Sequence, residues 1–226
     1  MKIARNVEML EISGPHGKFY PVLVWDNHNT VLFDTGLPGQ LELIRTAVEK
    51  TGITFEGISE IILTHHDIDH IGCARKFMEI GAKIMAHEKE IPYIQGEVKS
   101  PKLIKMEEQL NEMSSEEKAF YFRLREGSSN LYVSVDKGLK DKDVLPYCGG
   151  IEVIYTPGHT PGHISLLLKE SNVLITGDAA NASESKMTIP NPEHSLDMSK
   201  AMKSFEKLKR LNPDFVICYH GGLCKI

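Results

Sequence analysis

The chain has 226 residues, of which 41% are hydrophobic and 25% are charged, as is ordinary for a globular protein with a sizeable core. Its formal net charge of -5 argues against nucleic acid or an anionic membrane as the main partner, because either would favour a basic face. No stretch approaches the roughly 20 apolar residues that span a bilayer, and the N-terminal residues lack the apolar core of a secretory signal. We therefore expect a cytoplasmic protein.

Strand and helix patterns alternate along the first third of the chain. The helices are marked by apolar residues at helical spacing, with glycine or proline at their ends, and the strands by short apolar runs. The predicted strands cover residues 19–25, 30–33, 61–64 and 83–86, and the predicted helices cover residues 41–48 and 74–80.

The segment from about 88 to 145 differs in character, because it is rich in Lys, Glu, Met and aromatic residues. Leu103, Met106, Leu110 and Met113 recur at helical spacing, and Ser114 with Glu117 forms the capping-box pattern that begins a second helix, at 116–125. We interpret the segment as a helical insert over a sheet core. Whether it covers a substrate or is simply two packed helices stays open.

Strand patterns resume at residues 151–155, 164–168 and 173–176. One long helical pattern then covers 196–211, and a last strand at 215–219 ends the chain almost at once. The alternation of strands and helices predicts an α/β fold.

The four cysteines are scattered without C-x-x-C spacing, which excludes a disulfide framework and a zinc ribbon as first interpretations. We expect reduced, buried thiols. Cys73 follows the histidine cluster described next and is a candidate to line its pocket.

Residues 65–70 contain five His or Asp residues among six, directly after an apolar strand. The spacing lets His65, Asp67, Asp69 and His70 converge, while His66 points elsewhere. Burying so many polar groups without a metal would leave costly unpaired atoms. Imidazoles and carboxylates that converge in a strand-end loop suit Zn, Fe or Mn.

Four further polar residues each follow a predicted strand or the tight turn after one. They are His159 in a Pro-Gly-His turn, Asp178 after the strand at 173–176, His220 near the end of the chain, and Asp34 after the strand at 30–33. Each is a weak signal alone, but their order and shared placement at strand ends make a strong one.

The order of these five motifs resembles the metallo-β-lactamase superfamily, which includes glyoxalase II and the acyl-homoserine lactonases. The resemblance covers essentially the whole chain. It implies an αββα sandwich with the site at one edge, so that residues 1–226 form a single domain with a helical insert at about 88–145. It also implies that Asp34 orders the site from behind the ligands.

The resemblance further implies a site for two divalent metal ions, with zinc as the first choice and iron or manganese as alternatives. The implied ligands are His65, Asp67 and His159 for the first ion, Asp69, His70 and His220 for the second, and Asp178 shared between them.

Three departures from the family pattern matter. Asp67 replaces the second histidine of the signature H-x-H-x-D-H, which makes the site harder and favours iron or manganese more than an all-histidine site would. Asp178 is followed by Ala-Ala-Asn, without the tyrosine that lactonases carry near this point. We also expect no counterpart of the C-terminal helical domain that binds the thiol carrier in glyoxalase II.

The other histidines have weaker assignments. His163 is a candidate to support the site or simply a polar residue that begins a strand. His16, His28 and His194 are expected in loops, and His87 has no clear place.

The function that follows is a dinuclear metal-dependent hydrolase of a small-molecule substrate, an ester, lactone or thioester. A hydroxide that bridges the metals would attack the substrate, with Asp178 holding both ions and Asp69 orienting the water and taking up its proton. No partner among nucleic acids or membranes is expected, and the oligomeric state stays open. Alternatives are a di-iron redox enzyme related to the flavodiiron oxygen and nitric oxide reductases, a phosphodiesterase, and a non-catalytic metal-binding module.

Overall fold

Two larger sheets face each other in the computed structural model, which describes residues 1–14 and 17–225. His16, assigned to a loop from the sequence, lies outside the described residues. The first sheet runs in the order β1 (Lys2–Ala4), β2 (Val7–Met9), β5 (Val22–Trp25), β6 (Thr30–Phe33), β7 (Glu60–Leu63), β8 (Lys83–His87) and β9 (Lys137–Leu139). The second runs in the order β10 (Val144–Leu145), β11 (Ile151–Tyr155), β12 (Ile164–Leu168), β13 (Val173–Ile175), β16 (Phe215–Cys218) and β17 (Gly222–Cys224). Two small hairpins, β3 (Ile12–Gly14) with β4 (Gly17–Phe19) and β14 (Asn181–Ser183) with β15 (Lys186–Thr188), complete the strands.

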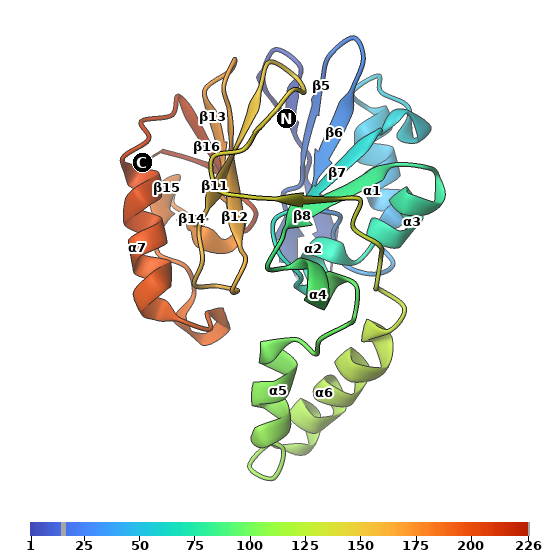
Figure 1. The fold of residues 1–226 in the computed structure, drawn as a ribbon, viewed down its shortest axis with the longest axis vertical. Helices are drawn as coiled ribbons and strands as arrows, with labels where there is room; N and C mark the ends of the chain where they lie inside the picture. Colours follow the sequence, from blue (N-terminus) through green and yellow to red (C-terminus); the bar gives the residue numbers. More distant parts are fainter. Residues whose placement is uncertain (15–16, 226) are drawn as a thin grey trace.

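Helices cover the outer face of each sheet (Figure 1). On the first sheet these are α1 (Leu41–Glu49), α2 (Ile68–Ile71) and α3 (Ala74–Glu79), and on the second sheet α7 (Met198–Lys209). Short 3-10 helices lie at Phe55–Gly57, Gly177–Ala179 and Pro192–His194, so His194 ends a helical turn where a loop was expected. The predicted αββα sandwich is confirmed.

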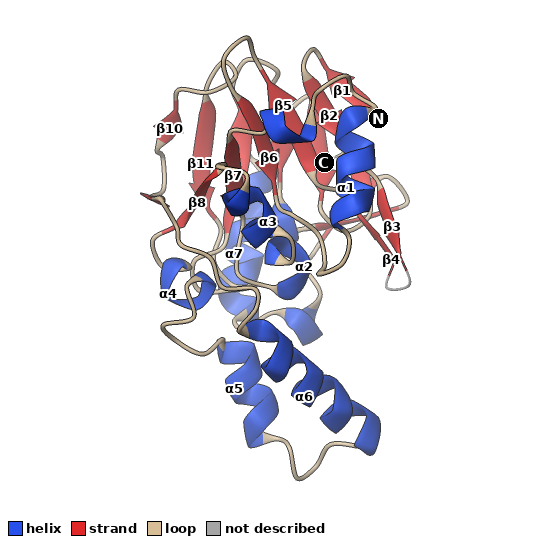
Figure 2. Ribbon diagram, turned by 90° about the vertical axis from the view of Figure 1, so that its right-hand side faces the viewer, coloured by secondary structure: helices blue, strands red, loops and turns tan. Residues whose placement is uncertain are grey.

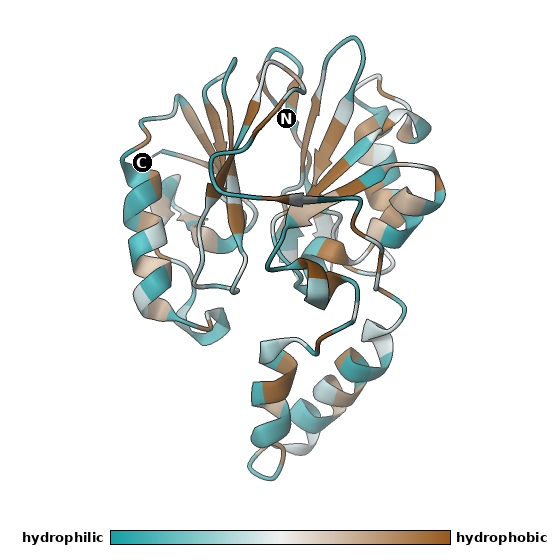
Figure 3. Ribbon diagram, viewed as in Figure 1, coloured by the Kyte–Doolittle hydropathy of each residue, from teal (hydrophilic) through white to brown (hydrophobic). Residues whose placement is uncertain are grey.

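Alternate residues of each central strand are buried on opposite faces. In β6, Val31 and Phe33 pack between the sheets, whereas Leu32 packs against the helices. In β13, Val173 and Ile175 pack between the sheets and Leu174 packs against α7. Both faces of these strands are therefore apolar, which is why the sequence shows continuous apolar runs, and Figure 3 shows the same concentration along the strands.

The helical segment between β8 and β9 is shorter than the expected 88–145. It contains α4 (Ile91–Ile94), α5 (Pro101–Glu108) and α6 (Ser115–Ser128), while residues 137–139 and 144–145 pair within the two sheets. The predicted capping box of Ser114 and Glu117 begins α6. Helices α5 and α6 form a hairpin, here called the α5–α6 hairpin, which projects beyond the sandwich at the end where α2 and α4 lie (Figures 1 and 2).

Three local predictions were wrong. The expected strand at 19–25 is divided between β4 and β5 around Pro21, which has no backbone N–H to donate to a strand ladder. The loop expected after residue 66 contains the short helix α2, in which Asp69 and His70 lie. The strand β16 is followed by β17, which pairs with it antiparallel.

In the two described ranges, no helix is both long enough and apolar enough to cross a membrane.

Asp26 links the β5–β6 turn to the second sheet. Its carboxylate accepts hydrogen bonds from the backbone N–H groups of His28 (2.7 Å), Asn29 (2.8 Å) and, just before β11, Cys148 (2.8 Å). Burial alone would raise the pKa of Asp26, but these hydrogen bonds outweigh it and lower the pKa to about 2.

We predict that Asp26→Asn removes a stabilisation that depends on pH. Because the folded pKa lies below the unfolded one, the charged carboxylate stabilises the fold above about pH 4, and this contribution is lost as the pH falls towards about 2. At pH 6 the free energy of unfolding of the wild type should exceed that of Asp26→Asn by about 1–2 kcal/mol. This is less than the full pKa shift would give, because the carboxylate is partly exposed. Urea unfolding at pH 6 and pH 3 should show the advantage shrinking, whereas an equal difference at both pH values contradicts the prediction.

Candidate metal centre

The candidate ligands follow strands that end at one edge of the sandwich. Parallel pairing of β6 with β7, and of β13 with β16, brings the carboxyl ends of neighbouring strands together in each sheet. His65 follows β7, Asp178 follows β13 and His220 follows β16. Since the carboxyl ends of parallel strands share one edge, residues far apart in the sequence meet there.

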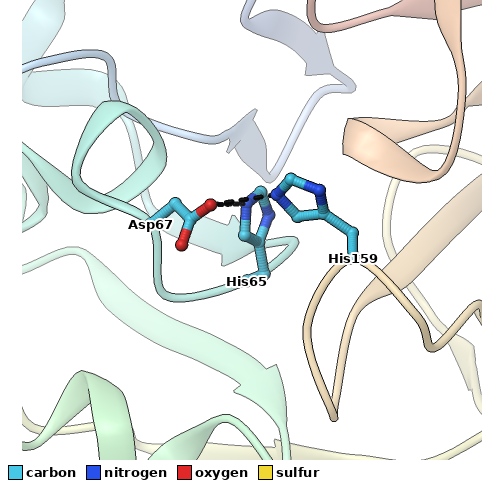
Figure 4. A group of neighbouring side chains, drawn as sticks. All are labelled: His65, Asp67 and His159. Atoms are coloured by element: carbon cyan, nitrogen blue, oxygen red, sulfur yellow. Dashed lines mark hydrogen bonds and ion pairs between the residues drawn. The ribbon is translucent and has the colours of Figure 1, made fainter. Parts of the chain in front are cut away.

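The first group consists of His65, Asp67 and His159 (Figure 4). The Oδ2 atom of Asp67 lies 3.2 Å from Nε2 of His65 and 2.9 Å from Nε2 of His159. His65 is fully buried and His159 is 4% exposed, so water does not compete freely for these atoms.

The second group consists of Asp69, His70 and His220. The Oδ2 atom of Asp69 lies 3.7 Å from Nε2 of His70 and 3.3 Å from Nε2 of His220. Tyr219 fixes the helix that carries Asp69, because its hydroxyl donates to the Asp69 carbonyl oxygen at 2.5 Å.

Asp178 lies between the two groups. Its Oδ2 is 3.4 Å from Nε2 of His159 and 3.3 Å from Nε2 of His220, and its Oδ1 is 3.3 Å from Nε2 of His70. Two ligand atoms about 2.1 Å from one tetrahedral ion are about 3.4 Å apart, so these separations suit atoms that share an ion. The structure thus brings together all seven residues named as ligands from the sequence.

The buried ligand atoms lack other partners. Nε2 of His65, Nε2 of His70 and Oδ1 of Asp178 are inaccessible to solvent and make no hydrogen bond. Unpaired buried polar atoms of this kind cost about 1–3 kcal/mol each unless something binds them. Their convergence therefore fits divalent metal ions, with nitrogen and carboxylate oxygen donors that suit Zn, Fe or Mn.

Asp34 orients two of the histidines from behind. Its backbone has φ 60°, a left-handed conformation that Asp tolerates, and its carboxylate accepts from the N–H of Thr64 (2.8 Å), the Thr64 hydroxyl (2.9 Å) and Nδ1 of His70 (2.9 Å). Because the Thr64 hydroxyl donates its proton to Asp34, its oxygen accepts a hydrogen bond from Nδ1 of His65 at 3.0 Å. Both histidines consequently carry their proton on Nδ1 and turn a free Nε2 lone pair towards the site.

Two of the candidate ligands, His65 and Asp178, have the charge state that metal binding requires. Burial lowers the pKa of His65 well below its usual value and keeps the imidazole neutral. Burial also opposes ionisation of Asp178, but His220, His70 and His159 outweigh it and hold the pKa of Asp178 well below its usual value. A neutral imidazole and an ionised carboxylate are the donor states that a metal requires.

His163 supports the site without joining either group of ligand atoms. Its Nε2 accepts a hydrogen bond from the backbone N–H of Asp178 at 2.9 Å, and its Nδ1 donates to the Thr156 hydroxyl, also at 2.9 Å. Of the two interpretations that the sequence left open, the structure favours the supporting role.

His66 turns away from the ligands, as its register predicts. Its Nδ1 pairs with the buried carboxylate of Glu90, and its Nε2 lies 2.9 Å from the hydroxyl of Ser100. Glu90 also accepts from the Thr160 hydroxyl and the Gly162 N–H, at 2.8 and 2.6 Å. The sequence does not indicate this network, because a glutamate in a charged segment gives no signal of burial.

Three other residues differ in role or place from what the sequence suggested. Cys73 packs in the core against the helices, where its thiol donates to the Leu37 carbonyl oxygen, and burial raises its pKa to about 11. It does not line the site. His87 ends β8 and stacks on Tyr155 at 4.6 Å. Lys102, which the sequence did not single out, contacts Asp67 and His159 from the α5–α6 hairpin.

Gly72 permits the close approach of the two loops that carry Asp34 and His70. A Cβ atom at this position would lie 2.4 Å from the Gly36 carbonyl oxygen, a contact that the backbone cannot relieve easily. The N–H of Gly72 donates to that same oxygen at 2.9 Å.

Comparison with known proteins gives a family. A family model described as the metallo-beta-lactamase superfamily matches residues 20–220. The chain belongs to the metallo-β-lactamase superfamily. A solved structure of the family protein TTHA1429 from Thermus thermophilus has a TM-score of 0.71 and 20% identity and covers 99% of this chain and 76% of that chain.

Curated relatives carry hydrolase names. The probable metallo-hydrolase YflN of Bacillus subtilis is 29% identical over 86% of this chain and 76% of its own length. The hydroxyacylglutathione hydrolase GloC of Haemophilus influenzae is 25% identical over 90% of this chain and 86% of its own length. The N-acyl homoserine lactonase of Bacillus cereus is 29% identical over 81% of this chain and 66% of its own length. The predicted enzyme class, a metal-dependent hydrolase, is confirmed.

We predict that Asp67→Ala lowers the metal content by about one ion per chain, whereas His66→Ala leaves the content unchanged. Asp67 lies within the first ligand group, and His66 bonds only to Glu90 and Ser100 in the contacts described. His66→Ala should instead cost about 1–3 kcal/mol of stability, because Glu90 loses a buried partner. Elemental analysis with urea unfolding measures both effects, and the reverse pattern would show that the ligand register is wrong.

Proposed function

We propose that the protein is a dinuclear metallohydrolase that cleaves a small ester, thioester or lactone. The observation that carries this proposal is the position of Asp178, whose Oδ2 lies 3.4 Å from Nε2 of His159 in the first ligand group and 3.3 Å from Nε2 of His220 in the second. In this proposal, His65, Asp67 and His159 hold one ion, Asp69, His70 and His220 hold the other, and Asp178 is shared.

The bound ions would supply Lewis acidity, which lowers the pKa of a bound water to about 7 and polarises the substrate carbonyl. The chain's own groups position the reactants. Asp69 has its backbone held by Tyr219 and its carboxylate beside His220, so it can orient the attacking water and accept its proton. The hydrogen bonds of Asp34 and Thr64 keep the imidazoles of His65 and His70 in one tautomer during the reaction.

Attack by water without a covalent enzyme intermediate fits the surroundings. Burial raises the pKa of Cys73 to about 11 and that of Cys148 to about 12, so neither thiol ionises readily at neutral pH. Cys148 also lies beside Asp26 in the turn region, in contact with the Asn29 carbonyl oxygen rather than with the ligand groups.

The substrate class rests on two supports. GloC and the lactonase of Bacillus cereus carry names that denote a thioester and a lactone substrate, and both cleave at a carbonyl carbon. The α5–α6 hairpin projects from the end of the sandwich where α2 and α4 lie (Figure 1). It carries exposed apolar side chains, including Ile104, Phe120 and Phe122. A small amphipathic acyl substrate suits such surroundings.

A di-iron redox reaction is the second candidate, because Asp67 places a carboxylate where most family members have histidine. Measuring oxygen consumption with a supplied electron donor separates it from hydrolysis.

We predict that Asp178→Asn abolishes hydrolysis of every accepted substrate, with the loss mainly in kcat, because the substitution removes both the charge and one shared oxygen ligand. Metal content should fall below that of the wild type. The test is a panel of esters, thioesters, lactones and phosphodiesters assayed after metal reconstitution, with Asp26→Asn as a charge-matched control away from the site. Full activity of Asp178→Asn, or a wild type that consumes oxygen but hydrolyses nothing, would falsify the proposal.

A further inference from the structure

A lysine from the α5–α6 hairpin reaches the candidate metal centre. Lys102 lies in the first turn of α5, and its Nζ donates to the carboxylate of Asp67 and lies 2.9 Å from Nε2 of His159. Its side chain is only 24% exposed. The ligand side chains come from loops of the sandwich, so this cation is the contribution of the hairpin.

The start of α5 is fixed by buried contacts. Ser100, the residue before the helix, bonds to His66, and His66 pairs with Glu90, which is fully buried. Glu90 also binds the turn that carries His159, through Thr160 and Gly162. Lys102 is therefore held beside the site by a network that joins the hairpin to both ligand loops. It is not an unattached surface lysine.

The charge balance of the site indicates a role for the ammonium of Lys102. The four carboxylates of Asp34, Asp67, Asp69 and Asp178 together balance the charge of two divalent ions, so the ammonium of Lys102 is a positive charge beyond that balance. The side chain of Lys102 is partly exposed, so a bound molecule can meet its ammonium. A site with excess positive charge attracts anions and favours substrates that carry one.

We propose, on the basis of the hydrolase function above, that Lys102 is a specificity-determining residue that binds a carboxylate of the substrate. A bound first ion would take the two atoms that Nζ contacts, Oδ2 of Asp67 and Nε2 of His159, so the ammonium would turn from them to the substrate while α5 keeps it beside the site. The carboxylate of the substrate would then lie within a few bonds of the carbonyl that is cleaved. The substrate is an anionic ester or thioester, and neutral analogues bind more weakly.

Paired substrates and four proteins test this inference. The proteins are the wild type, Lys102→Met, Lys102→Arg and the control Lys105→Met, which removes an exposed lysine of the same helix. One substrate pair places the charge on the acyl side, as succinyl and butanoyl thioesters of one neutral thiol. The other places it on the leaving group, as acetyl thioesters of mercaptoacetate and of ethanethiol. Metal content is measured first and should be equal in all four proteins.

Lys102→Met should raise KM for the charged member of at least one pair about tenfold, the usual effect of losing one charge-assisted hydrogen bond, with kcat changed little. KM for the neutral members should not change, Lys102→Arg should retain most of the preference, and Lys105→Met should match the wild type. Calorimetry with succinate gives a readout independent of turnover, and Lys102→Met should weaken its binding by a similar factor.

Two results separate this inference from the hydrolase proposal. If the wild type hydrolyses these substrates but Lys102→Met changes charged and neutral members alike, the inference is overturned and the hydrolase stands. If the wild type hydrolyses nothing but binds succinate in a way that depends on Lys102, the anion site stands and the hydrolase proposal fails. A wild type that binds no succinate and prefers no charged substrate overturns the inference.

Discussion

The hydrogen bonds of Asp34 connect the sheet to the ligand loop. One carboxylate binds the backbone and side chain of Thr64, just after β7, and Nδ1 of His70 in α2. Through Thr64 the same carboxylate also determines which nitrogen of His65 is free. A buried carboxylate without such partners would cost several kcal/mol, so the loop conformation and the charge of Asp34 stabilise each other.

The rest of the site depends on how the two sheets meet. Neither sheet holds all the ligands, because His65 and His70 follow a strand of the first sheet whereas Asp178 and His220 follow strands of the second. The apolar layer between the sheets, with residues such as Phe33, fixes their relative position. Substitutions deep in this layer should therefore shift the candidate ligands relative to one another even where they contact none of them.

The α5–α6 hairpin has a different relation to the site. Few of its side chains are buried, Tyr121 being the exception within α6. It contacts two candidate ligands through Lys102, and the Ser100–His66 bond joins its start to the loop that carries His65. Such a segment can change its outer surface without disturbing the metal ligands. The sandwich edge carries the candidate ligands, and the attached helical segment can vary separately. This arrangement is consistent with a family whose members act on different substrates.

The sequence by itself determined the layers and the convergence of the ligands. Apolar runs ended by His or Asp predicted strands with polar groups at one edge, and the order of the motifs predicted their partners. The alternation in residues 65–70 also predicted that His66 turns away from the ligands, because neighbouring residues in an extended segment point in opposite directions.

Only the tertiary structure decided what surrounds the ligands. Glu90 and Lys102 sit in a charged segment whose pattern is that of an exposed helical insert, and their contacts join residues 24 to 72 positions apart. Strand β17 and the division at Pro21 were missed for a related reason, since short strands are stabilised by their neighbours rather than by their own residues. Local patterns therefore identified the candidate metal ligands, whereas burial and long-range pairing determined which other charges reach them.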